Sequence, residues 1–363
     1  MTPEPEPAAS EAAAVTGRLR TSDFDFDLPS RLIAQRPAAD RDGSRLLVLD
    51  RQRRTFGDRR FPDLAGYLEA GDALVLNDTR VFPARLTGRK PTGAHAEVLL
   101  LAPLPDDETG RHWEAIVRPG GKLKPGREIV VSEELRVQIV DSTAAGGRIV
   151  RLDGPGDPMA LIESYGRVPL PPYVERDADG EDRERYQTVY AESVGSVAAP
   201  TAGLHFTPEL LRRLEEKGVR VVRVTLHVGL GTFRPVDVED PSEHELHAER
   251  WEMTPECASV LNGVRSSGRR VWAVGTTSAR VLETAAGPDG RFTPGSDWTD
   301  LYILPPRRFL GVDGLLTNFH LPRSSLLMLV SAFAGTGLVL EAYRHAVREE
   351  YRFYSYGDAM LIL

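Results

Sequence analysis

The chain has 363 residues, of which 41% are hydrophobic and 27% charged, a composition that excludes fibrous, collagen-like and wholly disordered proteins. Its formal net charge of −8 is the opposite of what is expected of a protein that coats nucleic acid. The only cysteine, Cys257, excludes an intrachain disulfide and a cysteine-rich zinc site, so we expect a cytoplasmic protein.

The ends of the chain give no sign of export or of a membrane span. Residues 1–20 are rich in proline, glutamate and alanine without an apolar core, so they predict a disordered tail and not a secretory signal. The longest run without charge, residues 324–340, contains two glycines and is shorter than the ~20 apolar residues that a bilayer requires. It predicts a buried helix, a turn and a second helix.

The middle of the chain predicts two kinds of structure. Residues 71–155 alternate short β-type runs with turn signals at a spacing of roughly 8–12 residues, which is typical of a small antiparallel β-barrel. After residue 156, Thr207-Pro208 and Thr254-Pro255 begin predicted helices that alternate with apolar strands. We therefore predict an α/β domain, residues 21–70 and 156–363, with the barrel inserted into it.

Several polar segments interrupt this pattern at the ends of predicted strands. The segment at 275–278 places hydroxyls and amides where a strand passes into a helix, which suits a ribose, a carboxylate or a phosphate. Segments 77–80, 196–206, 226–233 and 317–325 have the same character, although ordinary turns, loops and capped helices explain them equally well. Gly229-x-Gly231 does not predict a Rossmann loop, because Pro235 follows where the helix would start and the third glycine is missing.

The segment at 244–250 contains His244, His247 and Glu249 at close spacing. The spacing differs from H-E-x-x-H and no third ligand is evident, so we predict no metal site. Proton transfer by a histidine is the stronger interpretation, and a solvated surface is the alternative.

Taken together, the segments closely resemble a known family. The matching stretches include DFDLPSRLIAQRP, LNDTRVFPARLTG, VRPGGKLKPG, GRVPLPPYV, SVGSVAAPTAGLHFT, VTLHVGLGTFRPV, HELHAE, VGTTSARVLE, LLTNFHLPRSSLLMLVSAFAG and FYSYGDAMLI. In this order they resemble the S-adenosylmethionine:tRNA ribosyltransferase-isomerases of queuosine biosynthesis, from Asp23 onward. One segment, residues 300–309, departs from the family's usual Tyr-Pro-Gly-Tyr pattern.

The resemblance implies an α/β domain with an inserted barrel and an unusual reaction. The ribosyl moiety of S-adenosylmethionine is transferred to 7-aminomethyl-7-deazaguanine at the wobble position of tRNA and isomerised, giving epoxyqueuosine-tRNA, adenine and methionine. The implied partners are this tRNA and S-adenosylmethionine, with no other cofactor and no membrane, and we expect a monomer. The alternatives are an enzyme acting on a free deazapurine nucleoside and a non-catalytic RNA-binding protein.

The implied chemistry needs a base for the carbon beside the sulfonium, an acid for the departing adenine, and a π-face or carboxylate near the sulfonium. The titratable candidates in matching motifs are His205, His227, His247, His320, Asp78 and Glu249. The candidates for binding S-adenosylmethionine are Gly229, Gly231, Thr232, Phe233, Gly275, Thr276, Thr277, Phe206 and Tyr356. We favour His205 and His247 for proton transfer and His227 for substrate positioning.

Arginine dominates the basic residues, since only four of the 45 are lysine. A GC-rich genome accounts for most of this bias, and the remainder suggests contacts with phosphates. We expect the cluster Arg51, Arg53, Arg54, Arg59 and Arg60 to contact RNA.

Overall fold

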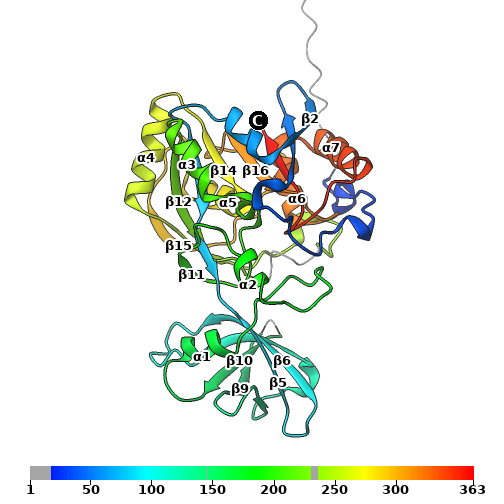
Figure 1. Cartoon of the computed structure of the whole chain (residues 1–363), viewed down its shortest axis with the longest axis vertical. Coiled ribbons are helices and arrows are strands. Elements are labelled where there is room, and N and C mark those ends of the chain that lie inside the picture. Colours follow the sequence, from blue (N-terminus) through cyan, green and yellow to red (C-terminus); the bar gives the residue numbers. More distant parts are fainter. Residues whose placement is uncertain (1–17, 145, 230–235) are drawn as a thin grey trace, which may run out of the picture.

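The computed structural model describes residues 18–144, 146–229 and 236–363. Within them, nine strands form one mixed sheet, here called the large sheet (Figure 1). Its strands lie in the order β15 (Gly295–Thr299), β13 (Glu249–Met253), β12 (Arg220–Leu226), β3 (Ala73–Asn77), β14 (Val271–Val274), β16 (Gly314–Asn318), β17 (Ala359–Ile362), β1 (Arg45–Asp50) and β2 (Thr55–Arg60). The four central strands β12, β3, β14 and β16 are parallel, so their carboxyl ends meet at one edge.

Helices cover both faces of the large sheet and bury its central strands. One face packs against α4 (Pro255–Ser266), α5 (Gly275–Ala285), α6 (Ser325–Ala334) and α7 (Thr336–Arg348). The other face packs against α3 (Pro208–Glu216) and the 3₁₀ segments Phe61–Gly66 and Thr201–His205. Apolar side chains alternate between these two layers along β3 and β14, which makes both strands fully buried.

Local capping explains why the predicted helix starts are confirmed. The side chains of Thr207, Thr254 and Ser324 each accept a hydrogen bond from the backbone three residues on, at the first turns of α3, α4 and α6. Residues 324–340 form α6, a turn at Gly335 with φ of 88°, and the start of α7. Among the described residues no single helix is long and apolar enough to cross a membrane. α6 and α7 taken together satisfy that criterion by length and composition alone, and the chain bends by 116° between them.

The barrel is closed by strands from one continuous stretch of the chain. In spatial order they are β10 (Arg148–Asp153), β7 (His112–Arg118), β6 (His95–Pro103), β5 (Arg85–Arg89), β8 (Glu128–Val130) and β9 (Arg136–Ser142). Their inward side chains form a separate core together with α1 (Pro158–Tyr165). The predicted fold class, an α/β domain with an inserted antiparallel barrel, is therefore confirmed.

The predicted boundary at residue 71 needs correction. β3 lies inside the large sheet between β12 and β14, and β4 (Thr79–Val81) pairs with β11 (Ser193–Ser196) in a small two-stranded sheet. The barrel strands begin at Arg85 and end at Asp153. The run Ala73–Asn77 is buried along its whole length, as befits a strand covered on both faces and not a half-exposed barrel strand.

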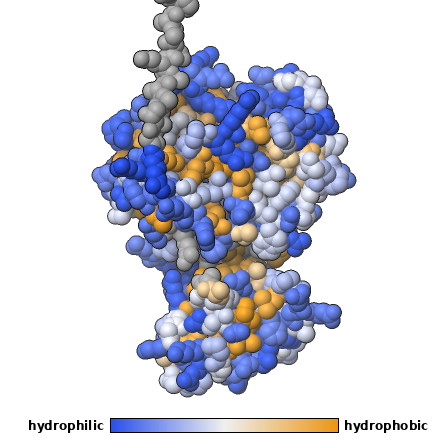
Figure 2. Space-filling view, turned by 180° about the vertical axis from the view of Figure 1, so that it is seen from behind, coloured by the Kyte–Doolittle hydropathy of each residue, from blue (hydrophilic) through white to orange (hydrophobic). Residues whose placement is uncertain are grey.

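A narrow waist joins the barrel to the larger domain (Figures 1 and 2). The outgoing and returning chains lie side by side there, since Arg85 and Arg167 exchange two backbone hydrogen bonds of 3.1 and 2.9 Å. The returning chain then passes through α2 (Asp182–Arg185) before it reaches β11. In Figure 2, apolar side chains gather at this waist. Residues 1–17, which include most of the predicted tail, lie outside the described part of the chain.

Candidate active site

A cleft opens at the carboxyl ends of the parallel strands. It is lined by Val228 after β12, by Gly275–Thr277 after β14 and by Thr317–His320 at the end of β16, together with residues 199–202 and 354–355. This edge is the usual ligand crevice of an open α/β sheet. The cleft holds about 850 Å³ of space free of protein atoms, counting its opening to solvent. Four of the polar segments identified in the sequence, far apart along the chain, thus meet in one place.

Two helices direct their amino ends at the cleft. Gly275, Thr276 and Thr277 form the first turn of α5, and Ser324 caps α6. The hydroxyls of Thr277 and Ser278 are buried and have no hydrogen-bond partner among the described residues. Unpaired amides and hydroxyls at helix amino ends favour a carboxylate or a ribose hydroxyl. Gly275, Thr276 and Thr277 thus lie at the cleft, and their role in binding S-adenosylmethionine stays a prediction.

Two tyrosines in contact, tilted by 44° to each other, form part of the cleft wall. The rings of Tyr173 and Tyr354 have centroids 4.0 Å apart, and the Tyr173 hydroxyl hydrogen-bonds to Ser355. No aspartate, glutamate, lysine or arginine of the described chain lines the cleft. An aromatic surface in an uncharged cleft is suited to a cation such as a sulfonium.

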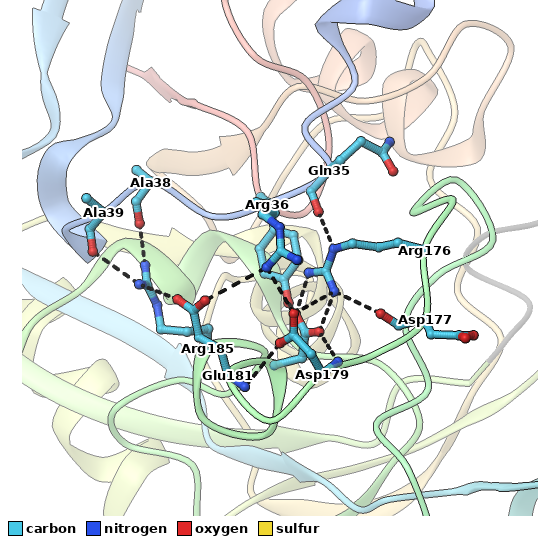
Figure 3. A network of polar contacts seen from close by, with 11 residues as sticks. Gln35, Arg36, Ala38, Ala39, Arg176, Asp177, Asp179, Glu181 and Arg185 are labelled. Carbon is cyan, nitrogen blue, oxygen red and sulfur yellow. Dashed lines mark hydrogen bonds and ion pairs between the residues drawn. The ribbon is translucent and has the colours of Figure 1, made fainter.

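A polar network holds the segment that bears Tyr173. Arg176 forms two hydrogen bonds of 2.6 and 2.7 Å with Asp182, and its Nε donates to the Gln35 carbonyl at 3.0 Å (Figure 3). Tyr356 donates its hydroxyl to the same Asp182 at 2.8 Å. The chain returning from the barrel is thereby fixed to the amino-terminal segment at 35–39, which places Tyr173 at the cleft.

His320 lines the cleft and His205 lies behind it. His320 Nε2 is 2.8 Å from the Thr317 hydroxyl, and burial lowers the pKa of this histidine to about 3. His205 lines a smaller adjoining pocket, and burial lowers its pKa to about 4. Both imidazoles are neutral near pH 7.

His205 belongs to a chain of hydrogen bonds that ends at the cleft wall. Its Nδ1 is 2.9 Å from the Ser44 hydroxyl, and its Nε2 is 3.2 Å from the amide nitrogen of Asn318. That nitrogen also donates to the Tyr354 carbonyl, and the Asn318 oxygen accepts from Thr201 at 2.9 Å. Two acceptors therefore fix the Asn318 nitrogen, and Thr201, which also lines the cleft, fixes its oxygen. His205 acts in this geometry as an acceptor that positions Asn318.

His227 lies at the mouth of the cleft, one residue before Val228. Its Nδ1 is 2.9 Å from the Thr79 hydroxyl, and burial lowers the pKa of the half-buried ring. Asp78 is next to Thr79 in sequence and accepts a 2.7 Å hydrogen bond from Thr225. His227 and Asp78 are thus close to the cleft without lining it.

His247 and Glu249 have different surroundings and do not line the cleft, so the proton-transfer role predicted for them stays a prediction. His247 is exposed, whereas Glu249 is buried and forms an ion pair with Arg280 of α5. Glu249 also accepts a 2.8 Å hydrogen bond from the Gly229 amide. Side chains two residues apart on one strand lie on the same face. His247 precedes β13, which begins at Glu249, so this rule does not apply to the pair and His247 is exposed.

Two predicted aromatic contacts also need correction. Phe206 is fully buried and packs edge-on against Phe61, because the segment that bears it folds onto the sheet beneath α3. Tyr356 lines the smaller pocket beside His205 and is held by Asp182. Gly231, Thr232 and Phe233 lie outside the described residues.

The aromatic wall was missed by the sequence reasoning. Tyr173 lies in the quoted stretch GRVPLPPYV, and Tyr354 in FYSYGDAMLI, two residues from the predicted Tyr356. A tyrosine has no local pattern that separates a core position from a cleft wall, so the pairing of these rings depends on the fold. Within the described chain there is no group of three or more His, Cys, Asp or Glu that could hold a metal ion.

Comparison with known proteins shows the family of this chain. A family model described as a queuosine biosynthesis protein matches residues 21–362. The chain belongs to this family. It is 54% identical over 347 residues to the S-adenosylmethionine:tRNA ribosyltransferase-isomerase of Symbiobacterium thermophilum, covering 95% of this chain and 100% of that protein. It is 53% identical over 350 residues to the enzyme of the same name from Moorella thermoacetica, covering 95% and 100%.

A solved structure from this queuosine family shares the fold. The S-adenosylmethionine tRNA ribosyltransferase of Thermotoga maritima is 40% identical, with a TM-score of 0.54, and the match covers 94% of this chain and 100% of that one. The predicted family is therefore confirmed, and this family member is an enzyme.

Proposed function

We propose that this member of the queuosine family transfers the ribosyl moiety of S-adenosylmethionine to 7-aminomethyl-7-deazaguanine at the wobble position of a tRNA and isomerises it. The products are epoxyqueuosine-tRNA, adenine and methionine. The observation that supports this most directly is the uncharged cleft with two tyrosine rings in contact and two helix amino ends at its walls.

The cleft has a suitable surface for each part of S-adenosylmethionine. The faces of Tyr173 and Tyr354 suit the sulfonium cation. The amino ends of α5 and α6, with the unpaired hydroxyl of Thr277, suit the methionine carboxylate or the ribose hydroxyls. The Asn318 oxygen, whose position the bonds to His205 and Thr201 fix, has a second lone pair for an N–H or O–H donor.

Histidines supply the neutral acceptors that a deprotonation step requires. Among the titratable residues predicted from the sequence, His320 is the one that lines the cleft. A base must receive a proton from the carbon beside the sulfonium, and we assign this role to His320. His205 positions Asn318, and His227 is placed to contact the incoming base at the mouth of the cleft. No metal ion or redox cofactor takes part, so activity should survive dialysis against a chelator.

The test is adenine release by the purified chain from S-adenosylmethionine with three additions. These are tRNA bearing the aminomethyl base, the free aminomethyl-deazaguanine nucleoside, and tRNA with guanine at the same position. We expect release with the first addition alone. Release with the free nucleoside would support the alternative nucleoside enzyme, and tRNA binding without adenine release would support a non-catalytic RNA-binding protein.

A further inference from the structure

A row of three side chains extends from the mouth of the cleft to the edge of the large sheet. The His227 amide donates to the Arg250 carbonyl at 2.9 Å, and Arg250 lies directly opposite Trp298 in the pairing of β13 with β15. Opposed residues on antiparallel strands point to the same face, so His227, Arg250 and Trp298 lie side by side. With neighbouring strands about 4.8 Å apart, the row is roughly 10 Å long. Its inner end is one residue from Val228 in the cleft wall.

The face that bears this row is open to solvent at Arg250 and Trp298, whereas the His227 ring is half-buried against Thr79 and Gly195. The neighbouring residues Leu226, Trp251 and Met253 point to the opposite face, where they join the core with α4. Trp298 is 61% exposed, the most exposed of the large hydrophobic side chains described. Arg250 is exposed and forms no hydrogen bond or ion pair through its side chain with the described residues. An unpaired guanidinium beside an exposed indole has no evident structural role.

We propose that the His227–Arg250–Trp298 row binds unpaired nucleotides of the RNA substrate that adjoin the base in the cleft. The inference rests on the proposed function. Loop bases are recognised by stacking on aromatic rings and guanidinium planes. At ~3.4 Å per stacked nucleotide, the row has room for about three nucleotides. Continuity with the cleft places these nucleotides next to the reacting one.

The charges around the row favour contacts with bases over contacts with phosphates. Glu252 lies opposite Thr225, one register position away, and the Asp78 carboxylate accepts from the same threonine. These two carboxylates offset the positive charge of Arg250, so the surface is not strongly basic. Stacking on Trp298 tolerates such a mixed environment, because it depends on the π-face and not on net charge.

The experiment measures the affinity of the full-length chain for the substrate tRNA by fluorescence anisotropy. Trp298→Ala should weaken binding by about fivefold to a hundredfold, as loss of one stacked base predicts, and Trp298→Phe should restore most of it. Arg250→Gln should also weaken binding. The matched control is Arg344→Gln, an exposed arginine of α7 on the opposite face of the large sheet, and it should bind as the parent does. Binding of S-adenosylmethionine should be unchanged in every variant.

A second probe tests stacking itself. It is an anticodon stem-loop with abasic residues on both sides of the reacting base. The parent should bind the abasic loop more weakly than the intact loop. Trp298→Ala should bind the abasic loop with the same affinity as the parent does. Two results would overturn the role of the row without touching the proposed function. One is Trp298→Ala or Arg250→Gln binding tRNA as tightly as Arg344→Gln, and the other is a loss on Trp298→Ala that is the same for the abasic and the intact loop. A parent chain that binds no tRNA at all would instead overturn the proposed function.

Discussion

At the scale of single residues, His205 shows how a fold reassigns a side chain. The sequence indicated a histidine beside small residues in a loop, which is typical of a proton-transfer group. The structure encloses the ring between Ser44, Asn318 and Phe61, with centroids of the two rings 5.0 Å apart. Neighbours brought in from three distant segments cannot be recognised from the loop itself. The titratable type was therefore predictable, and the role was not.

The replacement of His205 distinguishes positioning from proton transfer. In His205→Gln the side-chain oxygen can still accept from the Asn318 amide, so kcat/KM should stay within a few-fold of the parent. His205→Leu leaves that amide donor unpaired at a cost of about 1–3 kcal/mol, and kcat/KM should fall tenfold to a hundredfold with a raised KM for S-adenosylmethionine. Single-turnover adenine release on folded protein measures both. A loss of about 10²–10⁴ in kcat for both variants would restore the proton-transfer assignment.

The buried histidines also predict how stability depends on pH. Burial lowers the pKa of His205 to about 4, below its ordinary value of 6.5. Between these values the unfolded chain binds a proton that the folded chain does not, so the free energy of unfolding should rise with pH from about 4 to 6.5 and then level off. Urea denaturation across this window measures the slope. His205→Gln should reduce the slope, and an unchanged slope would show that other groups cause it.

At the scale of elements, the buried ion pair of Glu249 and Arg280 ties β13 to α5. Arg280 also donates to the carbonyls of Leu301 and Thr299 at 3.0 and 3.2 Å. The carboxylate therefore fixes the helix whose first turn lines the cleft. Nothing in the sequence indicated this pairing, because the partners are 31 residues apart on different elements.

Glu249→Gln tests this structural role. It leaves a buried guanidinium without its counter-ion and should lower the free energy of unfolding by about 3–5 kcal/mol. Thermal denaturation measures the loss, and turnover per folded molecule should change only a few-fold. Arg280→Met in the same chain should recover part of the stability, since no unpaired charge then remains buried. A large fall in turnover without loss of stability would return Glu249 to the catalytic candidates.

Element boundaries and element partners differ in how far sequence predicts them. The caps at Thr207, Thr254 and Ser324 are bonds within four residues, and the predicted helix starts follow from them directly. β3 was placed with the barrel because it precedes the barrel strands in sequence. Its true partners begin at Arg220 and Val271, and no local pattern reports a pairing over such a distance.

At the scale of the whole molecule, the waist brings the outgoing and the returning segment of the chain into direct backbone contact. A Cβ built on Gly166 would lie 1.9 Å from the Pro83 carbonyl oxygen, so only glycine permits this approach. The hydrogen bonds between Arg85 and Arg167 follow immediately. The orientation of the barrel therefore depends on a contact of backbone with backbone.

Gly166→Ala should disturb the waist while sparing the cleft. We expect tRNA-dependent adenine release to fall at least tenfold, because the barrel and the large sheet would no longer be held in register, with binding of S-adenosylmethionine nearly unchanged. Gly180→Ala is the matched control, since a Cβ there meets no atom within 4 Å. Equal activity of the two variants would show that the waist tolerates movement.

The insertion of the barrel also has a consequence for how the chain folds during synthesis. Barrel strands such as β5 and β6, or β9 and β10, are neighbours in sequence, so the barrel can form as soon as residues 85–153 are made. β3 is made earlier, yet Ala73 must wait for Arg220 and Val271. Pairings of such long sequence separation are slow because loop closure comes before any gain in contacts. The apolar strand Ala73–Asn77 is thus exposed for much of translation, and the period between completion of the barrel and closure of the large sheet is when the nascent chain is most prone to aggregate.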